Sequence, residues 1–133
     1  MADAVTSQII FDGARSVIMK FTNVSDGTGE TAAVKVNVSA LTRYQGQACT
    51  SVNITKLDAM TVGMGVDILW DATTDVVCAT LGSDQFISFD FNHFGGITNN
   101  AGAGKTGNIL FTTVGAALGD RYTVVLEMTK NYG

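Results

Sequence analysis

The chain has 133 residues, 46% of them hydrophobic and 15% charged, which is the composition of one packed domain rather than of a disordered segment. Eight basic and twelve acidic residues give a net charge of −4, so the chain lacks the positive surface that binds nucleic acid or an anionic membrane. No apolar stretch approaches the roughly 20 residues that span a bilayer, and residues 1–15 lack the features of a signal peptide.

Apolar residues occupy every second position in one run after another, which is the spacing of side chains that share one face of a pleated strand. Val17, Met19 and Phe21, for example, share one face of the second run. In chain order, the pattern predicts eight or nine short strands, at residues 7–11, 16–24, 31–39, 51–57, 66–70, 76–81, 85–92, 109–114 and 121–129. This pattern is typical of a sandwich, jelly roll or barrel, and we expect an all-β fold, an antiparallel, jelly-roll-like β-sandwich, in one domain over residues 1–133.

The connections between these strands suggest how the sheets are joined. Residues 25–29, Ser-Asp-Gly-Thr-Gly, form a turn of hairpin type, so we expect strands 16–24 and 31–39 to pair antiparallel. Residues 42–50 form a longer polar connection, whose length suits a crossing between two sheets. The glycines of residues 62–65 predict a bulge or bend before the next strand.

Residues 95–108 form the most glycine-dense stretch, and a loop of this length is usually functional or mobile. Within it, residues 102–106, Gly-Ala-Gly-Lys-Thr, are similar to the end of a nucleotide-binding P-loop. The full motif requires a glycine where this chain has Asn99, and it must open a helix, whereas residues 107–113 are glycine-led and β-branched. We therefore expect a surface loop and no bound cofactor.

Residues with catalytic or metal-binding chemistry are sparse. His93 is the only histidine, and Asp90, three residues before it, should point to the opposite face of a strand. No second histidine, cysteine cluster or EF-hand loop completes a metal site, and no Gly-x-Ser-x-Gly motif presents a nucleophilic serine. We expect no enzyme activity, no catalytic or metal-binding residue, and no small-molecule substrate.

Cysteines and aromatic residues give the remaining expectations. Cys49 lies in a predicted polar loop and Cys78 in an apolar run, so two free thiols are expected unless the fold brings them together. Trp70 is in phase with the apolar residues of its strand and should lie in the core. Tyr44, in a loop, and Tyr132, at the tail, are better candidates for surface contacts.

Strand and turn motifs lie along most of the chain, at residues 18–30 (IMKFTNVSDGTGE), 69–73 (LWDAT), 89–91 (FDF), 94–96 (FGG), 107–113 (GNILFTT) and 119–123 (GDRYT). Together they resemble small virion structural proteins of tailed bacteriophages. The resemblance implies a capsid decoration or cement protein, made in the host cytoplasm and placed on the capsid surface, where it bridges capsid subunits. It also implies the major capsid protein and copies of the chain itself, as a homotrimer, as partners.

Two segments are expected to contact partners, the flexible N-terminal residues 1–7 and the loop of residues 95–108, because flexible segments can order on binding. With the two tyrosines, the candidate partner-binding residues are Ala2, Asp3, Ala4, Val5, Thr6, Tyr44, Asn99, Asn100, Gly102, Gly104 and Tyr132. The alternative function is a glycan-binding jelly-roll module, and another head–tail, tail or baseplate component also remains open. Jelly rolls commonly present aromatic and aspartate-bearing loops to sugars, and residue chemistry alone does not separate these functions.

Overall fold

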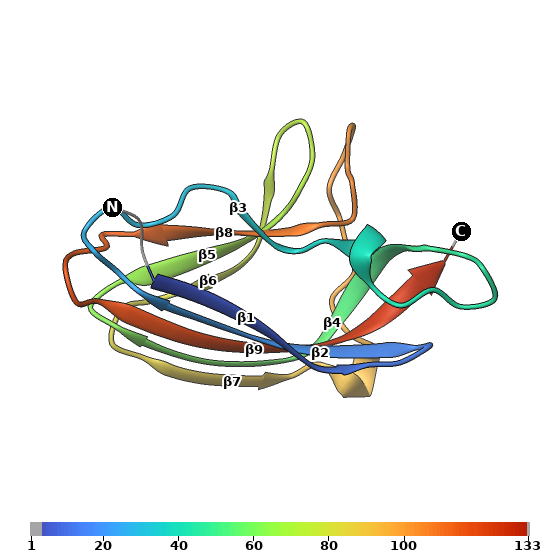
Figure 1. Cartoon of the computed structure of the whole chain (residues 1–133), viewed down its shortest axis with the longest axis horizontal. Helices are drawn as coiled ribbons and strands as arrows, with labels where there is room; N and C mark the ends of the chain where they lie inside the picture. Colours follow the sequence, from blue (N-terminus) through green and yellow to red (C-terminus); the bar gives the residue numbers. More distant parts are fainter. Residues whose placement is uncertain (1–3, 133) are drawn as a thin grey trace.

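The computed structural model describes residues 4–132, which form two antiparallel β-sheets packed face to face (Figure 1). No helix in this range is long and apolar enough to cross a membrane. The strands and two short 3₁₀ turns are β1 (Ala4–Asp12), β2 (Ser16–Val24), β3 (Ala33–Val36), η1 (Val38–Ala40), β4 (Cys49–Val62), β5 (Gly65–Trp70), β6 (Val76–Leu81), β7 (Phe86–Asp90), η2 (Asn92–Phe94), β8 (Ile109–Val114) and β9 (Arg121–Tyr132).

The strand order identifies the fold. One sheet has the order β1-β2-β9-β4-β7 and the other has the order β3-β8-β5-β6. The antiparallel pairs are nested, because β5 pairs with β6, β4 with β7, β3 with β8 and β2 with β9. Rolling one long antiparallel hairpin into two layers produces this nesting, which is the jelly roll, and β1 adds an outer strand beside β2. The predicted antiparallel, jelly-roll-like β-sandwich is confirmed.

A single cluster of apolar side chains fills the space between the sheets. In β2, the alternation places Val17 and Phe21 in this core with no exposed surface. The Phe21 ring meets the Phe111 ring of the opposite sheet edge-on, with 5.3 Å between centroids. Trp70 is also fully buried, as its phase predicts. Burying each such large side chain contributes about 1.5–3 kcal/mol, so the period-2 pattern accounts for how the two layers hold together.

The predicted hairpin between β2 and β3 is wrong. β2 pairs with β1 and β9, whereas β3 pairs with β8 in the other sheet. The N–H of Ser25 donates to the carbonyl of Asp120 (2.7 Å), and the N–H of Gly119 donates to the carbonyl of Ser25 (2.9 Å). These bonds tie the turn to the β8–β9 connection, so the chain crosses between the sheets here instead of returning along β2.

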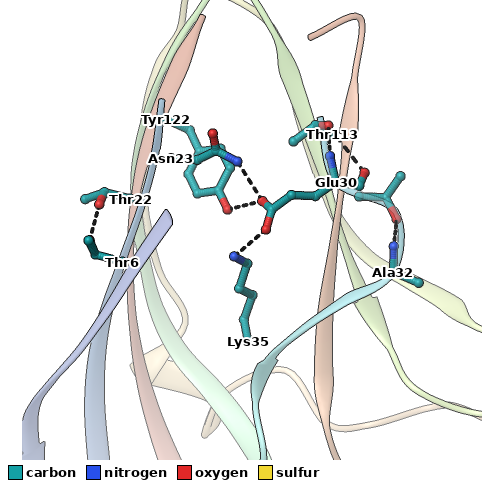
Figure 2. A network of polar contacts seen from close by, with 9 residues as sticks. Thr6, Thr22, Asn23, Glu30, Ala32, Lys35, Thr113 and Tyr122 are labelled. Carbon is teal, nitrogen blue, oxygen red and sulfur yellow. Dashed lines mark hydrogen bonds and ion pairs between the residues drawn. The ribbon is translucent and has the colours of Figure 1, made fainter. Parts of the chain in front are cut away.

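A buried polar network fixes the same crossing (Figure 2). The Glu30 carboxylate accepts hydrogen bonds from Asn23 Nδ2 (2.9 Å), the Tyr122 hydroxyl (2.6 Å) and Lys35 Nζ (2.5 Å). The backbone N–H of Glu30 donates to Thr113 Oγ1 (2.8 Å). Because these partners lie on β2, β9, β3 and β8, the side chain and backbone of Glu30 together connect strands of both sheets.

The long connection before β4 crosses between the sheets, as predicted, since it joins β3 to β4 in the other layer. β4 begins at Cys49 and ends at Val62, which makes it longer than the predicted residues 51–57. β2, β6 and β8 have their predicted bounds. β3 is shorter than predicted because the chain turns into η1 at Val38, where Asn37 Oδ1 accepts from the N–H of Ser39 (3.2 Å).

Of residues 1–7, which we expected to be flexible, residues 4–7 belong to β1. β1 is an outer strand with exposed side chains on both faces, so it lacks the alternation of burial that a sequence pattern reflects. Two predicted contact residues, Ala2 and Asp3, lie outside the described residues.

Candidate functional site

β1 forms one margin of the five-stranded sheet, and it pairs with a neighbour on one side only. Its large apolar side chains are each about half exposed, at 46–53%, and they are Val5, Ile9, Ile10 and Phe11. No lysine, arginine, glutamate or proline interrupts residues 4–11, although proteins commonly use such residues to protect an exposed strand edge. We call this strand with its four apolar side chains the β1 edge.

The opposite margin of the same sheet is also apolar. Phe86 and Phe89 of β7 are 70% and 51% exposed, and Phe94 of η2 is 61% exposed. The Phe91 ring lies between the last two, with its centroid 5.8 Å from that of Phe89 and 5.8 Å from that of Phe94. We call Phe86, Phe89 and Phe94 the phenylalanine edge.

Sequence reasoning missed the phenylalanine edge as a contact surface. The alternation in residues 85–92 predicted a strand, and aromatic residues in a strand are usually buried. β7 is instead the outermost strand of its sheet, so it has a neighbouring strand, β4, on one side only. The high density of phenylalanine in this short segment is the feature of the sequence that could have indicated a contact surface.

A shallow hollow of about 320 Å³ lies beside Phe86, and its lining residues are Asp58, Ala59, Met60, Phe86, Thr123 and Val125. The Asp58 carboxylate accepts a hydrogen bond from Ser88 Oγ (2.5 Å) and lies 3.8 Å from Lys56 Nζ. The hollow therefore combines an exposed aromatic ring with a carboxylate and a hydroxyl group.

The glycine-dense loop is anchored to a neighbouring turn, beside which it stands in Figure 1. Thr106 Oγ1 donates to Asp71 Oδ2 (2.7 Å), and the N–H of Thr73 donates to the carbonyl of Ala103 (3.1 Å). Gly107 has a φ of +86°, and a Cβ there would lie 1.9 Å from the Thr50 carbonyl oxygen, so this position requires glycine. The chain then enters β8 rather than a helix, which agrees with the rejection of a P-loop from the sequence.

The predicted contact residues do not form one surface. The tyrosine pair lies at one end, where the Tyr44 ring centroid is 6.0 Å from that of Tyr132 and Cys49 pairs with Tyr132. Asn99 lines a cavity of about 550 Å³ together with Cys49, so the glycine-dense loop reaches the same end. β1 begins at the other end of the sandwich (Figure 1). The exposed candidates are Ala4, Val5, Thr6, Tyr44, Asn100, Gly102 and Gly104, while Asn99 and Tyr132 are half-buried.

Both cysteines are free thiols, as predicted. Cys49 is buried at the start of β4 rather than in a polar loop, and its Sγ donates to the Ser51 carbonyl (3.1 Å). Burial raises the pKa of the Cys49 thiol, and burial raises the pKa of Cys78 to about 12. Both groups are therefore protonated and weakly nucleophilic at neutral pH.

His93 and Asp90 make their main contacts with different residues. The His93 ring packs edge-on against Phe94, with 5.2 Å between centroids. Asp90 Oδ1 accepts hydrogen bonds from the backbone N–H (2.9 Å) and from Nδ2 (2.8 Å) of Asn92, and these bonds lower the pKa of Asp90. Asp90 thus fixes the turn into η2. Over residues 4–132, no three His, Cys, Asp or Glu side chains gather in a way that could hold a metal ion.

No known protein family matches the sequence, and no curated protein is similar to it. Among solved structures, a mutant of the family 29 carbohydrate-binding module CBM29-2 aligns over 96% of this chain and 93% of its own, with 9% identity and a TM-score of 0.41. Another mutant of this module, complexed with cellulohexaose, aligns over 95% and 91%, with 11% identity and a TM-score of 0.41. Likeness at these scores does not identify a ligand or a function for this chain.

Proposed function

We propose that this protein is a virion structural protein of a tailed bacteriophage, and that it decorates the capsid through the phenylalanine edge. The observation that carries the proposal is the exposure of Phe86, Phe89 and Phe94 on one uncovered margin of a sheet. Phe86 and Phe89 point to opposite faces of β7, because Phe86 pairs with the exposed Met60 and Phe89 with the buried Leu57. Large exposed apolar groups along one sheet margin are typical of a surface that another protein covers. The motifs that resemble phage virion proteins support the major capsid protein as that partner.

The arrangement of the two apolar margins also suits a bridging role. The β1 edge and the phenylalanine edge lie at opposite sides of one five-stranded sheet. A domain with contact surfaces on opposite sides can touch two neighbours at once, which a protein that ties capsid subunits together must do. The jelly roll is compatible with this role because it serves in viral capsid proteins, although the same fold also serves in lectins.

Replacing Phe86 and Phe94 together with serine should weaken binding to capsids that lack this protein by at least about tenfold, because aromatic side chains at an interface centre usually carry much of the affinity. Binding can be measured by co-sedimentation of the purified protein with such capsids. Leu118 is a matched control, because it is 81% exposed but lies in the β8–β9 connection, so Leu118→Ser should bind like the wild type. Equal binding by the double variant and the wild type would contradict the proposal.

The hollow beside Phe86 favours a second candidate function, the binding of a glycan. An aromatic ring can stack on the apolar face of a sugar, while the Asp58 carboxylate and the Thr123 hydroxyl can bond its hydroxyl groups. If this function holds, a glycan array should give a ligand whose binding Asp58→Asn removes. The same substitution should leave capsid binding within about twofold, because a rim charge contributes little to affinity. Absence of array binding by the wild type would exclude this candidate for the glycans displayed.

A further inference from the structure

We propose that β1 pairs antiparallel with β1 of a second copy of this chain, and that the two-fold axis of the resulting dimer passes through Ser7. The outer side of β1 has no neighbouring strand in the sheet, so its outward backbone N–H and C=O groups can form a further ladder. The proposal concerns a different surface from the phenylalanine edge and does not depend on capsid binding.

The register follows from which side of β1 each residue faces. Val5 pairs with the buried Asn23 and Ile9 pairs with the buried Met19, so Val5 and Ile9 face the inner side of the sheet. The residues between them alternate, and the pairing with β2 is regular until a bulge between Ile9 and Phe11. A regular stretch on both sides of Ser7 is therefore available for pairing.

Pairing about a two-fold axis at Ser7 sets side chains from the same face of the two β1 strands opposite each other. Val5 then lies opposite Ile9 of the second copy, and Thr6 lies opposite Gln8 of the second copy. Cross-strand pairs of β-branched apolar residues on one face stabilise antiparallel ladders, and here both members are half exposed in the single chain, at 46% and 51%. A shift of the register by one residue would set inner-facing residues against outer-facing ones, which disfavours it.

Charge favours a second copy as the occupant. The protein carries a net charge of −4, so two copies repel each other overall, and self-association requires a surface free of acidic side chains. Residues 4–11 contain no charged side chain, and Asp12 at the end of the strand is paired within the chain to Lys130. Two β1 strands can therefore meet without repulsion. Pairing of this isologous kind closes at two copies, unlike the homotrimer that the phage resemblance implies.

A cysteine at the axis tests the register directly. Opposed residues of an antiparallel pair have Cα atoms about 4.5–5.5 Å apart, which permits a disulfide. The variant Ser7→Cys should form a covalent dimer in most molecules on mild oxidation. Gln8→Cys is the matched control, because its two copies would be displaced by two residues along the strand, about 8 Å apart, and should remain uncross-linked. The natural thiols should not interfere, since burial keeps both of them protonated.

A second pair of variants tests the apolar contact without new chemistry. The wild type should have twice its chain mass of 13.9 kDa by light scattering, while Ile9→Lys should shift toward one chain and should abolish cross-linking when added to Ser7→Cys. Val114→Lys is the control, because Val114 is also 54% exposed but lies on β8 in the other sheet. A monomeric or trimeric wild type, open-ended aggregation, or equal cross-linking through Gln8→Cys would each overturn the proposal. None of these outcomes bears on the phenylalanine edge.

Discussion

Replacing Glu30 with alanine should lower the free energy of unfolding by about 3–5 kcal/mol, the usual cost of removing one partner from a buried ion pair. The Lys35 side chain is only 5% exposed, so the substitution would leave a buried ammonium group without its counter-ion. Asn23 and Tyr122 would also lose the oxygen atom to which they donate (Figure 2). Urea unfolding followed by tryptophan fluorescence measures the effect, because Trp70 is the only tryptophan and is fully buried.

The double variant Glu30→Met, Lys35→Met provides the control. When both charges are replaced by apolar groups of similar size, no uncompensated charge remains, and such replacements are often close to neutral. The double variant should therefore be more stable than Glu30→Ala. The substitution Tyr122→Phe removes the hydrogen bond that the tyrosine hydroxyl donates to the charged Glu30 and should lower the free energy of unfolding by about 1.5–3 kcal/mol. A loss below about 1 kcal/mol for Glu30→Ala would show that the network does not hold the crossing between the sheets.

The parts of the fold that depend on local pattern could be predicted from the sequence. β2, β6 and β8 begin and end at the predicted residues because their residues alternate or are bounded by turn residues. The burial of Trp70 and Phe21 follows from the same alternation, because each residue is in phase with the apolar residues of its strand. The connection predicted at residues 42–50 leads from β3 into β4 of the other sheet, as its length suggests, although its last two residues belong to β4.

The incorrect predictions concern which strands become neighbours. The turn after β2 has the residues of a hairpin, but backbone hydrogen bonds between Ser25 and two distant residues, Gly119 and Asp120, hold it where the chain enters the other sheet. A local pattern contains no information about these distant partners. The same limit applies to the candidate contact surfaces, because whether a strand such as β7 lies at a margin depends on the order of the whole sheet. Exposure of Phe86 could therefore be recognised only in the assembled fold.

Replacing Lys130 with methionine should also cost about 3–5 kcal/mol, for a related reason. The Lys130 side chain has no exposed surface, and its Nζ donates to the Asp12 carboxylate and to the carbonyls of Gly13 (2.6 Å) and Thr42 (3.1 Å). The substitution removes the donor from all three acceptors while keeping an apolar stem of similar length. Asp12→Asn should lower the free energy of unfolding less in the Lys130→Met background than in the wild type, because the two residues form one network.

The Asp12–Lys130 pair also predicts how stability depends on pH. Burial by itself raises the pKa of Asp12, but hydrogen bonds from Lys130 and Thr42 outweigh it, so the pKa lies below the ordinary value of 3.8. Asp12 therefore binds a proton more weakly in the folded chain than in the unfolded chain. Its contribution to stability is fully present above about pH 4 and is lost as the pH falls through the lower, folded-state pKa.

Urea unfolding of the wild type and of Asp12→Asn between pH 7 and pH 2 measures this contribution. The difference in unfolding free energy between the two proteins should be constant from pH 7 to about pH 5 and should decrease below about pH 4, because the asparagine does not titrate. Asp90 also has a lowered pKa, but it is present in both proteins, so its effect cancels in the difference. A difference that stays constant down to pH 2, or grows as the pH falls, would mean that Asp12 does not hold Lys130 as an ion pair in solution.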